Sequence, residues 1–471
     1  MSTPLDFLMI YPHAYGQGAY SQRLLLAVLQ KAGYSVRLLV VGNAVWLQKS
    51  EKLRNEFLEL VQGCKCVGFG FMSEAYQSVQ FLTRLIKSHM EKHVIYGGPH
   101  ATTSYMKMVG QADAIFVGES EKTLPAYVSA LLDKRRTDHI PQIVTNAPDF
   151  RQGATDDILM NLDELPIPLY SPKYHSELME DHIETTPEFY RNAYKHLQLM
   201  GSRGCPYSCT YCANSYIKKC LPEGTPYIRK RSVDHIMAEL RYACEELPIE
   251  TVAIEDDQFL VRDAKELEEF VEKYNQQVWL PINITGLSPA YLSPDKLAIL
   301  QGLPLSDIRI GIQTVSQNGL DVYRRRFANR NIDELSKTIA GLSRSLSIRY
   351  DIILDNPYET VQDYVQTLCF LSSLPKPFSL ILYHLTFFEG TELRDKAIAD
   401  GKIEPTNMKH TERSYVDLDD NYVNTLFQLL TTVKGHIPEP IMRLLTSSLF
   451  LRTAILQKMV RLVWATIAGK R

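Results

Sequence analysis

The first part of the chain alternates short apolar runs with longer segments that have the periodicity of amphipathic helices. Each apolar run has the length of a buried strand, and a helical segment or a glycine-rich turn follows it. Strands that alternate with helices in this way predict right-handed βαβ units and an open parallel sheet. The predicted strands are Asp6–Tyr11, Val36–Val41, Cys66–Met72, Val94–Gly98 and Ala114–Gly118.

A second alternation of the same kind begins after residue 196. It predicts six consecutive βα units, and functional side chains are expected at the carboxyl ends of their strands, as in complete barrels. We therefore predict an α/β fold with four parts: residues 1–135, a linker at 136–196, the βα units at 197–400, and a helical region at 401–471. The predicted strands of the second part are Leu197–Ser202, Glu250–Glu255, Pro281–Thr285, Ile308–Gln313, Arg349–Leu354 and Leu380–Leu385.

Composition and charge fit an ordinary globular protein. The 471 residues are 45% hydrophobic and 22% charged, and 51 Lys and Arg stand against 54 Asp and Glu. A formal net charge of −3 offers no overall attraction for nucleic acid, so we expect no nucleic-acid partner. No uncharged apolar run approaches the roughly 20 residues that span a bilayer. We expect a cytoplasmic protein whose eight cysteines are reduced thiols or metal ligands.

Three of the cysteines lie within eight residues, as Cys205, Cys209 and Cys212. Three thiolates on one loop can hold three irons of a 4Fe–4S cluster and leave the fourth iron open, whereas a closed structural site uses four. A zinc site with Cys220 as the fourth ligand is the alternative. The spacing C-x-x-x-C-x-x-C, with the aromatic Tyr211 before the third cysteine, resembles the signature of the radical S-adenosylmethionine (SAM) superfamily.

This resemblance implies a 4Fe–4S cluster on the three cysteines, SAM bound to the open iron, and a partial (βα)6 barrel. Tyr211 would pack near the adenine of SAM. Glu255 or Asp257 would receive its ammonium group, although a helix cap is the alternative for this acidic stretch. Gln313 would meet the ribose hydroxyls. The run Tyr323–Arg326 is interpreted as a solvated charge run, with a guanidinium for the SAM carboxylate as the alternative.

The first part resembles the cobalamin-binding domain that precedes some radical SAM enzymes, with a flavodoxin- or Rossmann-like sheet. His13 lacks the upstream Asp that normally orients a cobalt-ligating histidine, so we expect a polar loop residue near the cofactor. The residues that carry this resemblance, and that it places at the cofactor, are Tyr11, His13, Gly16, Gly97, Gly98, Gly118 and Glu119.

Together the two resemblances imply methyl transfer to an unactivated carbon or phosphorus centre, through methylcobalamin and a 5′-deoxyadenosyl radical. A radical redox reaction without methylation, such as ring closure, ring contraction or cyclisation, is one alternative. A non-catalytic cobalamin or iron–sulfur sensor is another. The implied partners are a small-molecule, lipid or peptide substrate and an external electron donor of the flavodoxin or ferredoxin type.

The C-terminal stretch from Ile441 to Arg471 has no acidic residue and an apolar helical pattern with six basic residues. A basic amphipathic helix of this kind can lie on an anionic membrane. Packing against the mouth of the βα units and a subunit contact are the alternatives.

Overall fold

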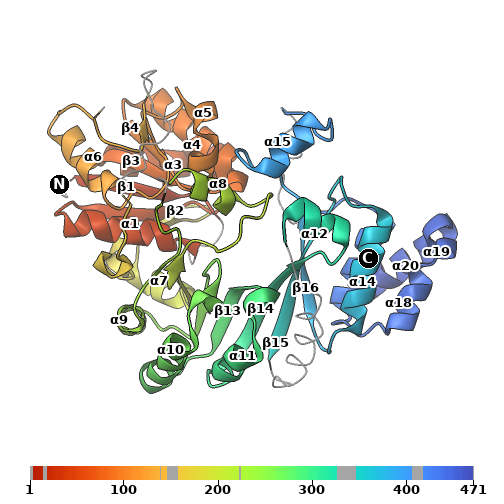
Figure 1. Ribbon diagram of the computed structural model, residues 1–471. Coiled ribbons are helices and arrows are strands. Elements are labelled where there is room, and N and C mark those ends of the chain that lie inside the picture. Colours follow the sequence, from red (N-terminus) through yellow and green to blue (C-terminus); the bar gives the residue numbers. More distant parts are fainter. Residues whose placement is uncertain are drawn as a thin grey trace. The chain divides into compact units, whose positions relative to one another are not determined.

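The computed structural model describes residues 4–13, 18–137, 139–145, 158–221, 224–325, 346–405 and 417–469 (Figure 1). The chain forms two compact units. The first consists of Met1–Gly204 and Ala213–Ala253, and the second of Cys205–Cys212 and Ile254–Arg471. The cysteine loop therefore groups with the C-terminal half of the chain.

The first unit contains an eight-stranded sheet in the order β6-β5-β4-β3-β1-β2-β7-β8. The strands from β5 to β7 in this order run parallel, and the two edge strands β6 and β8 are antiparallel. The predicted open parallel sheet is confirmed. The strands are β1 (Leu5–Tyr11), β2 (Val36–Val40), β3 (Cys64–Gly70), β4 (His93–Gly97), β5 (Ala114–Phe116), β6 (Ile143–Val144), β7 (His175–Leu178) and β8 (Ile183–Glu184).

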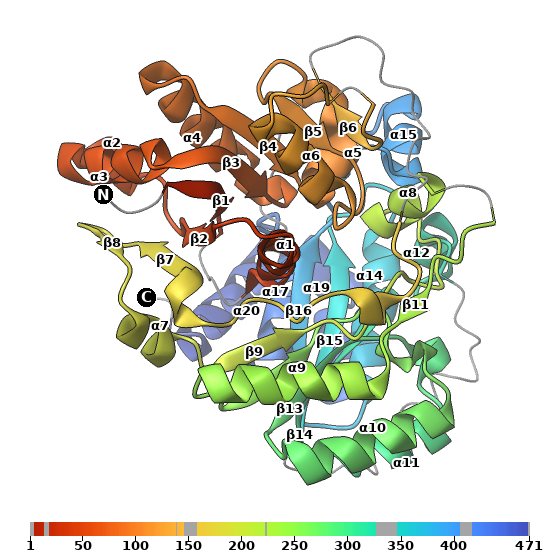
Figure 2. The same cartoon turned by 90° about the vertical axis from the view of Figure 1, so that its left-hand side faces the viewer.

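Alternate side chains of β1 enter two different apolar cores, because successive residues of a strand point to opposite faces. Phe7 and Met9 pack in the core beneath α1 and α6, whereas Leu8 and Ile10 pack beneath α3, α4 and α5. Helices thus cover both faces of the sheet (Figure 2). The helices of this unit are α1 (Tyr20–Lys31), α2 (Trp46–Lys49), α3 (Glu51–Gln62), α4 (Tyr76–His89), α5 (Pro99–Met108), α6 (Thr123–Leu132), α7 (Pro187–Ala193), α8 (Ala213–Lys219) and α9 (Val233–Glu246).

Part of the predicted linker is folded. Within residues 136–196, β7 pairs in parallel with β2 and continues the first sheet, β8 pairs with β7, and β6 forms the opposite edge. The division of the chain into four domains remains a prediction.

A second sheet has the order β16-β15-β14-β13-β12-β9. Its spatial order is its order along the chain, and β13 to β16 pair in parallel, which is the winding of a partial βα barrel. The predicted fold class is confirmed. The strands are β9 (His196–Leu199), β12 (Thr251–Ile254), β13 (Ile282–Leu287), β14 (Leu305–Gln313), β15 (Ser347–Leu354) and β16 (Ser379–His384). A separate two-stranded antiparallel sheet consists of β10 (Ser202–Arg203) and β11 (Arg229–Lys230).

Two long helices of the second unit begin at reciprocal capping boxes. Asp263 caps α10 reciprocally with Glu266, and Thr360 caps α14 in the same way with Asp363. None of the helices in the described ranges is long and apolar enough to cross a bilayer. The helices are α10 (Ala264–Gln277), α11 (Pro294–Leu300), α12 (Gln317–Tyr323), α14 (Val361–Ser373), α15 (Glu392–Ala399), α17 (Tyr422–Thr432), α18 (Glu439–Leu445), α19 (Ser448–Arg452) and α20 (Ala454–Ile467).

Candidate functional site

Thr210 anchors the cysteine loop within the second unit through its backbone and its hydroxyl. Its N–H donates to the carbonyl of Tyr323 at 3.2 Å, and its hydroxyl donates to the carbonyl of Val322 at 2.6 Å. Its own carbonyl accepts from the N–H of Leu393 at 3.0 Å. The loop between Cys209 and Cys212 is therefore fixed to the end of α12 and the start of α15.

A buried arginine lies against this loop. Arg325 is 7% exposed, and its guanidinium donates to the hydroxyl of Tyr211 at 3.1 Å and to the carbonyl of Gly311 at 2.8 Å. It also lies 4.0 Å from the sulfur of Cys209. The prediction that Tyr323–Arg326 is a solvated charge run is therefore wrong for Arg325. The run also contains Arg324, which is exposed, and Arg326, which lies outside the described residues.

Tyr211 is held from two sides. Its hydroxyl accepts from Arg325, and its ring packs edge-on against that of Tyr323 with centroids 4.9 Å apart. Burial raises the pKa of its hydroxyl. The ring therefore has a defined position beside the cysteines.

All eight cysteines are described and none forms a disulfide. Burial raises the pKa of the Cys205 thiol to about 11, and the negative charges of Asp257 and Cys209 add to this effect. Asp257 therefore lies near enough to interact electrostatically with the cysteine loop. A bound metal favours the thiolate, which is the form that ligates iron.

The three acidic residues that follow β12 lie in different environments. Glu255 accepts from the hydroxyl of Thr285 at 3.0 Å, and burial raises its pKa. Asp256 is buried against Arg262 at 3.4 Å, whereas Asp257 is exposed. The N-caps of the next two helical segments are other residues, Gln258 and Asp263.

Gln313 is the last residue of β14 and has a positive φ of 70°. Its amide oxygen is buried and has no hydrogen-bond partner in the described part of the chain. A buried acceptor of this kind calls for an explanation, and a hydroxyl donor from a ligand would satisfy it.

The ends of β14 and β15 are tied together by Glu359. One carboxylate oxygen accepts from Thr314 at 2.7 Å and from Ser316 at 2.9 Å, and the other accepts from Asn356 at 3.1 Å and from Tyr323 at 3.4 Å. Four protein donors therefore surround this carboxylate. It fixes the strand ends that carry Gln313 and the anchor of the cysteine loop.

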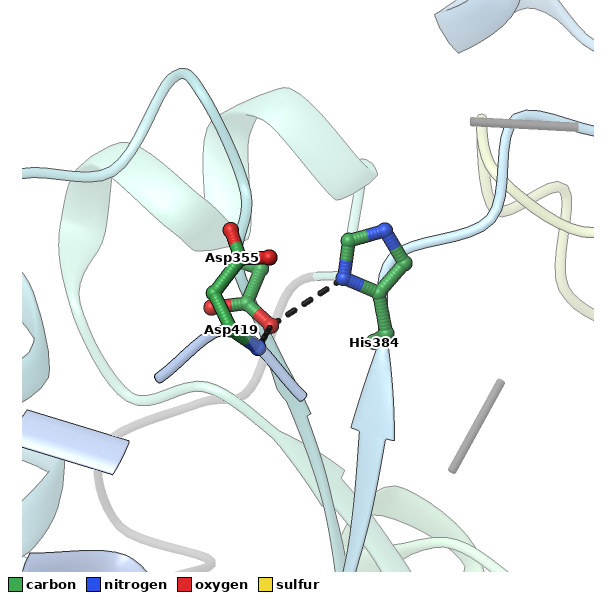
Figure 3. A group of neighbouring side chains, drawn as sticks. All are labelled: Asp355, His384 and Asp419. Atoms are coloured by element: carbon green, nitrogen blue, oxygen red, sulfur yellow. Dashed lines mark hydrogen bonds and ion pairs between the residues drawn. The ribbon is translucent and has the colours of Figure 1, made fainter. Parts of the chain in front are cut away.

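A second carboxylate joins the ends of β15 and β16 (Figure 3). Asp355 Oδ2 lies 3.0 Å from His384 Nδ1 and accepts from the N–H of Asp419 at 2.9 Å, while Oδ1 accepts from the amide of Asn424 at 2.7 Å. Burial raises the pKa of Asp355, but these donors outweigh it and hold that pKa below its usual range.

Asp355, His384 and Asp419 also bring three possible metal-ligand atoms close together. Donors already occupy both oxygens of Asp355, however, so the geometry is that of a hydrogen-bonded Asp–His pair. His384 is 4% exposed, and its Nε2 has no hydrogen-bond partner in the described ranges. Figure 3 shows the ring turning this nitrogen away from Asp355.

In the first unit, His13 follows β1 and lies beside Tyr11, with ring centroids 4.7 Å apart. A carboxylate does approach its ring, because Glu74 lies 3.6 Å from Nδ1, and the N–H of Met72 donates to Nε2 at 3.5 Å. Burial lowers the pKa of His13, and Glu74 opposes this shift. Sequence reasoning missed Glu74 because it lies far along the chain.

The predicted glycine turns differ in the room that they leave. A Cβ on Gly97 would meet its nearest atom at 3.9 Å, whereas Gly98 has φ +94° and a Cβ there would lie 2.8 Å from the backbone nitrogen of Phe71. The N–H of Gly118 donates to Thr102 at 2.9 Å. Gly16 lies outside the described residues.

Glu119 is engaged by two arginines of its own unit. Arg229 donates to both of its oxygens, and Arg203 lies 2.7 Å from Oε2. Burial raises the pKa of Glu119, but the two guanidinium groups outweigh it and hold that pKa below its usual range. The carboxylate is therefore ionised, and it links the end of β5 to the two-stranded sheet of β10 and β11.

Residues 199–371 match the radical SAM superfamily. A curated relative, the uncharacterised methyltransferase PH0819 of Pyrococcus horikoshii, is 24% identical over 359 residues, which cover 75% of this chain and 72% of the relative.

Two solved structures share the fold. The radical SAM methyltransferase TsrM of Kitasatospora setae, with cobalamin and a 4Fe–4S cluster bound, has a TM-score of 0.65 at 13% identity, covering 85% of this chain and 75% of its own. The cobalamin-dependent radical SAM enzyme OxsB, with aqua-cobalamin bound, has a TM-score of 0.59 at 17% identity, covering 85% of this chain and 56% of its own. The resemblance predicted from the cysteine spacing and the domain order is thereby confirmed.

Proposed function

We propose that this chain, whose residues 199–371 match the radical SAM superfamily, is a cobalamin-dependent radical SAM methyltransferase. Its substrate would be methylated at an unactivated carbon or phosphorus centre. The proposal depends on one observation: in the second unit the cysteine loop is fixed beside the polar ends of parallel strands, and a unit with its own parallel sheet precedes it in the chain.

Cys205, Cys209 and Cys212 would hold the cluster. Bound cluster, SAM and cobalamin would together supply reductive cleavage of SAM and a methyl donor. The chain's own part is to place these groups. Thr210 and Arg325 hold the loop, and the buried guanidinium of Arg325 sets a positive charge near Cys209.

Polar groups at the strand ends would bind SAM. The buried amide oxygen of Gln313, which has no partner among the described residues, would accept from a ribose hydroxyl. Glu255 or Asp257 would accept from the ammonium group. The ring of Tyr211 would pack against adenine. The proximity of Asp257 to Cys205 supports this arrangement.

We propose that His384 holds or moves a proton of the substrate. Asp355 accepts from Nδ1 and so keeps the lone pair of a neutral ring on Nε2. A buried Nε2 without a partner in the described ranges is then free to accept a hydrogen from a substrate N–H or O–H group.

In the first unit we propose that cobalamin binds near Tyr11, His13 and the glycine turns at Gly16, Gly97–Gly98 and Gly118. A Cβ at Gly97 would meet Phe116 only at an ordinary contact distance of 3.9 Å, so the backbone there is not crowded by the protein itself. Glu119 would hold Arg203 and Arg229 in place at this site, since its carboxylate already binds both.

The proposed partners are a small-molecule, lipid or peptide substrate and an external electron donor of the flavodoxin or ferredoxin type. We also propose a cytoplasmic location, which suits eight cysteines without a disulfide, and a peripheral membrane contact through the C-terminal helix.

Product analysis of the anaerobically reconstituted protein tests the proposal against its two rivals. Methylation yields both S-adenosylhomocysteine and 5′-deoxyadenosine. If 5′-deoxyadenosine appears without S-adenosylhomocysteine, the radical redox reaction without methylation is the function. A protein that binds the cofactors and forms neither product is a sensor.

A further inference from the structure

Helix α20 turns a stripe of large apolar side chains toward solvent. Five of them recur at helical spacings of three, four and one residues, and we call them the α20 face. They are Ile455 (73% exposed), Met459 (58%), Leu462 (60%), Val463 (53%) and Ile467 (51%).

Helix α20 is held in the described chain by contacts with α17 and α19. Val460 is 8% exposed, and at a spacing of three and seven residues it lies next to Val463 and Ile467 on the helix surface. The packed side of α20 therefore borders the α20 face, whose five side chains remain more than half exposed.

The neighbouring helices extend this apolar surface. Ile441 and Leu444 of α18 are 50% and 55% exposed, and Leu449 of α19 is 60% exposed. Figure 1 shows α18, α19 and α20 grouped beside α14. Eight of the fifteen exposed large hydrophobic residues in the described ranges lie between 441 and 467, and such a concentration marks an interaction site, unlike scattered single residues.

The sequence that carries the α20 face has charges of one sign. From Ile441 to the C-terminus there is no Asp or Glu. Arg443 pairs with Glu439 and Arg461 with Asp420, but Arg452 and Lys458 are exposed and form no ion pair within the described residues. Lys458 lies four residues before Leu462 on α20, and Arg452 ends α19, the helix that precedes α20.

We propose that the α20 face docks on an anionic lipid surface. The five apolar side chains would enter the boundary between headgroups and acyl chains, and Arg452 and Lys458 would meet the lipid phosphates. This assignment refines the membrane contact in the proposed function by naming its residues and the lipid charge, and it does not depend on the chemistry of SAM.

Geometry and charge favour a lipid surface over the other occupants. The 14 residues of α20 span about 21 Å, too short for a bilayer core of about 30 Å, so the helix lies in the surface. A second copy in a twofold arrangement would bring the same unpaired cations toward each other. Anionic headgroups neutralise them instead.

A cavity of about 420 Å³ lies between the start of α17 and α20, and Lys458 and Leu462, at one edge of the α20 face, line it together with Asp419 and Asp420. These two carboxylates disfavour a phosphate inside the cavity. The other four residues of the α20 face do not line it, so the lipid belongs on the exposed stripe.

Flotation of the full-length reconstituted protein with lipid vesicles tests the proposal. We expect binding to vesicles of phosphatidylcholine mixed with phosphatidylglycerol, weaker binding to phosphatidylcholine alone, and a loss of binding as salt screens the charges.

Matched variants separate the apolar from the charged contribution. Met459→Ser should weaken binding about tenfold or more, whereas Met106→Ser, at a methionine of α5 that is 72% exposed, should leave it unchanged. Arg452→Gln with Lys458→Gln should weaken it about fivefold for each charge removed, and Lys31→Gln with Lys49→Gln should not. Circular dichroism and SAM cleavage report whether each variant is folded.

Equal binding to both kinds of vesicle, no binding to either, or wild-type binding by Met459→Ser would overturn the proposal. So would a concentration-dependent dimer that Met459→Ser dissociates, since a second copy would then occupy the face. A protein that binds anionic vesicles without cleaving SAM would leave this docking intact and remove only the methyltransferase proposal.

Discussion

Nδ1 of His384 lies 3.0 Å from Oδ2 of Asp355, across the carboxyl ends of two neighbouring parallel strands. The same carboxylate accepts hydrogen bonds from Asp419 and Asn424 at the start of α17. One buried side chain therefore orients the imidazole and fastens the C-terminal helices to the sheet.

Asp355→Asn should lower the stability of the second unit by about 2 kcal/mol at neutral pH, because hydrogen bonds to a charged group are lost. The folded-state pKa of Asp355 is depressed, so its contribution is present above the unfolded pKa, near 3.8, and is lost as the pH falls through the folded value. Urea midpoints of both proteins at several pH values measure this difference. Asp395→Asn, at an exposed position, is the control, and a difference that grows below pH 4 would contradict the prediction.

Cys209→Ala should abolish SAM cleavage and prevent assembly of a cluster with about four irons per chain. The reason is that three thiolates are the proposed protein ligands, and two cannot hold the same cluster. Iron and sulfide analysis with product detection measures both effects. Cys244→Ala, at an exposed cysteine, should retain the full iron content; a fully active variant lacking all three loop cysteines would end the radical interpretation.

Arg325→Met should destabilise the protein by about 2 to 4 kcal/mol and reduce SAM cleavage. The substitution leaves the carbonyl of Gly311 and the hydroxyl of Tyr211 without their buried donor. Arg324→Met is a matched control at the next residue, because the Arg324 side chain is 62% exposed and a surface charge contributes little. Thermal unfolding and product assays compare the two, and equal effects would refute the assigned role of Arg325.

Most of the fold could be predicted from the periodicity of apolar residues. The run Arg349–Leu354 became β15, Ser347–Leu354, since alternating burial is encoded locally. β7 escaped prediction because its four residues, His175–Leu178, include two polar side chains and a charged one. Its place beside β2 depends on the sheet that is already present.

The candidate site could be predicted only where the spacing of residues along the sequence indicates a function. The three cysteines lie within eight residues, and the order of strands indicates which polar residues end them. Arg325 was missed because three adjacent arginines look solvated until the cysteine loop packs over one of them. The carboxylate beside His13 was missed because Glu74 approaches through tertiary folding.

Gly286→Ala should destabilise the second unit strongly, by about 3 kcal/mol or more, and should weaken SAM binding. Gly286 lies in β13 beside the acidic stretch and has φ +65°. A Cβ there would lie 1.9 Å from the carbonyl oxygen of Asp256. Gly401 has the same φ, +65°, with no atom within 4 Å of its Cβ position, so Gly401→Ala isolates the cost of the backbone conformation. Urea midpoints and SAM titrations measure the difference, and equal losses would show that the close approach does not matter.

His13→Ala should leave the electron paramagnetic resonance spectrum of the bound cob(II)alamin form unchanged. In the structure Nε2 of His13 faces the N–H of Met72 and Nδ1 faces Glu74, so neither ring nitrogen offers an uncommitted lone pair. The lower face of cobalt would then carry water or no ligand, and the wild-type spectrum should lack superhyperfine splitting from nitrogen. His89→Ala, in a surface helix of the same unit, controls for loss of a histidine elsewhere. A one-nitrogen splitting that disappears in His13→Ala and persists in His89→Ala would show that His13 is the axial ligand.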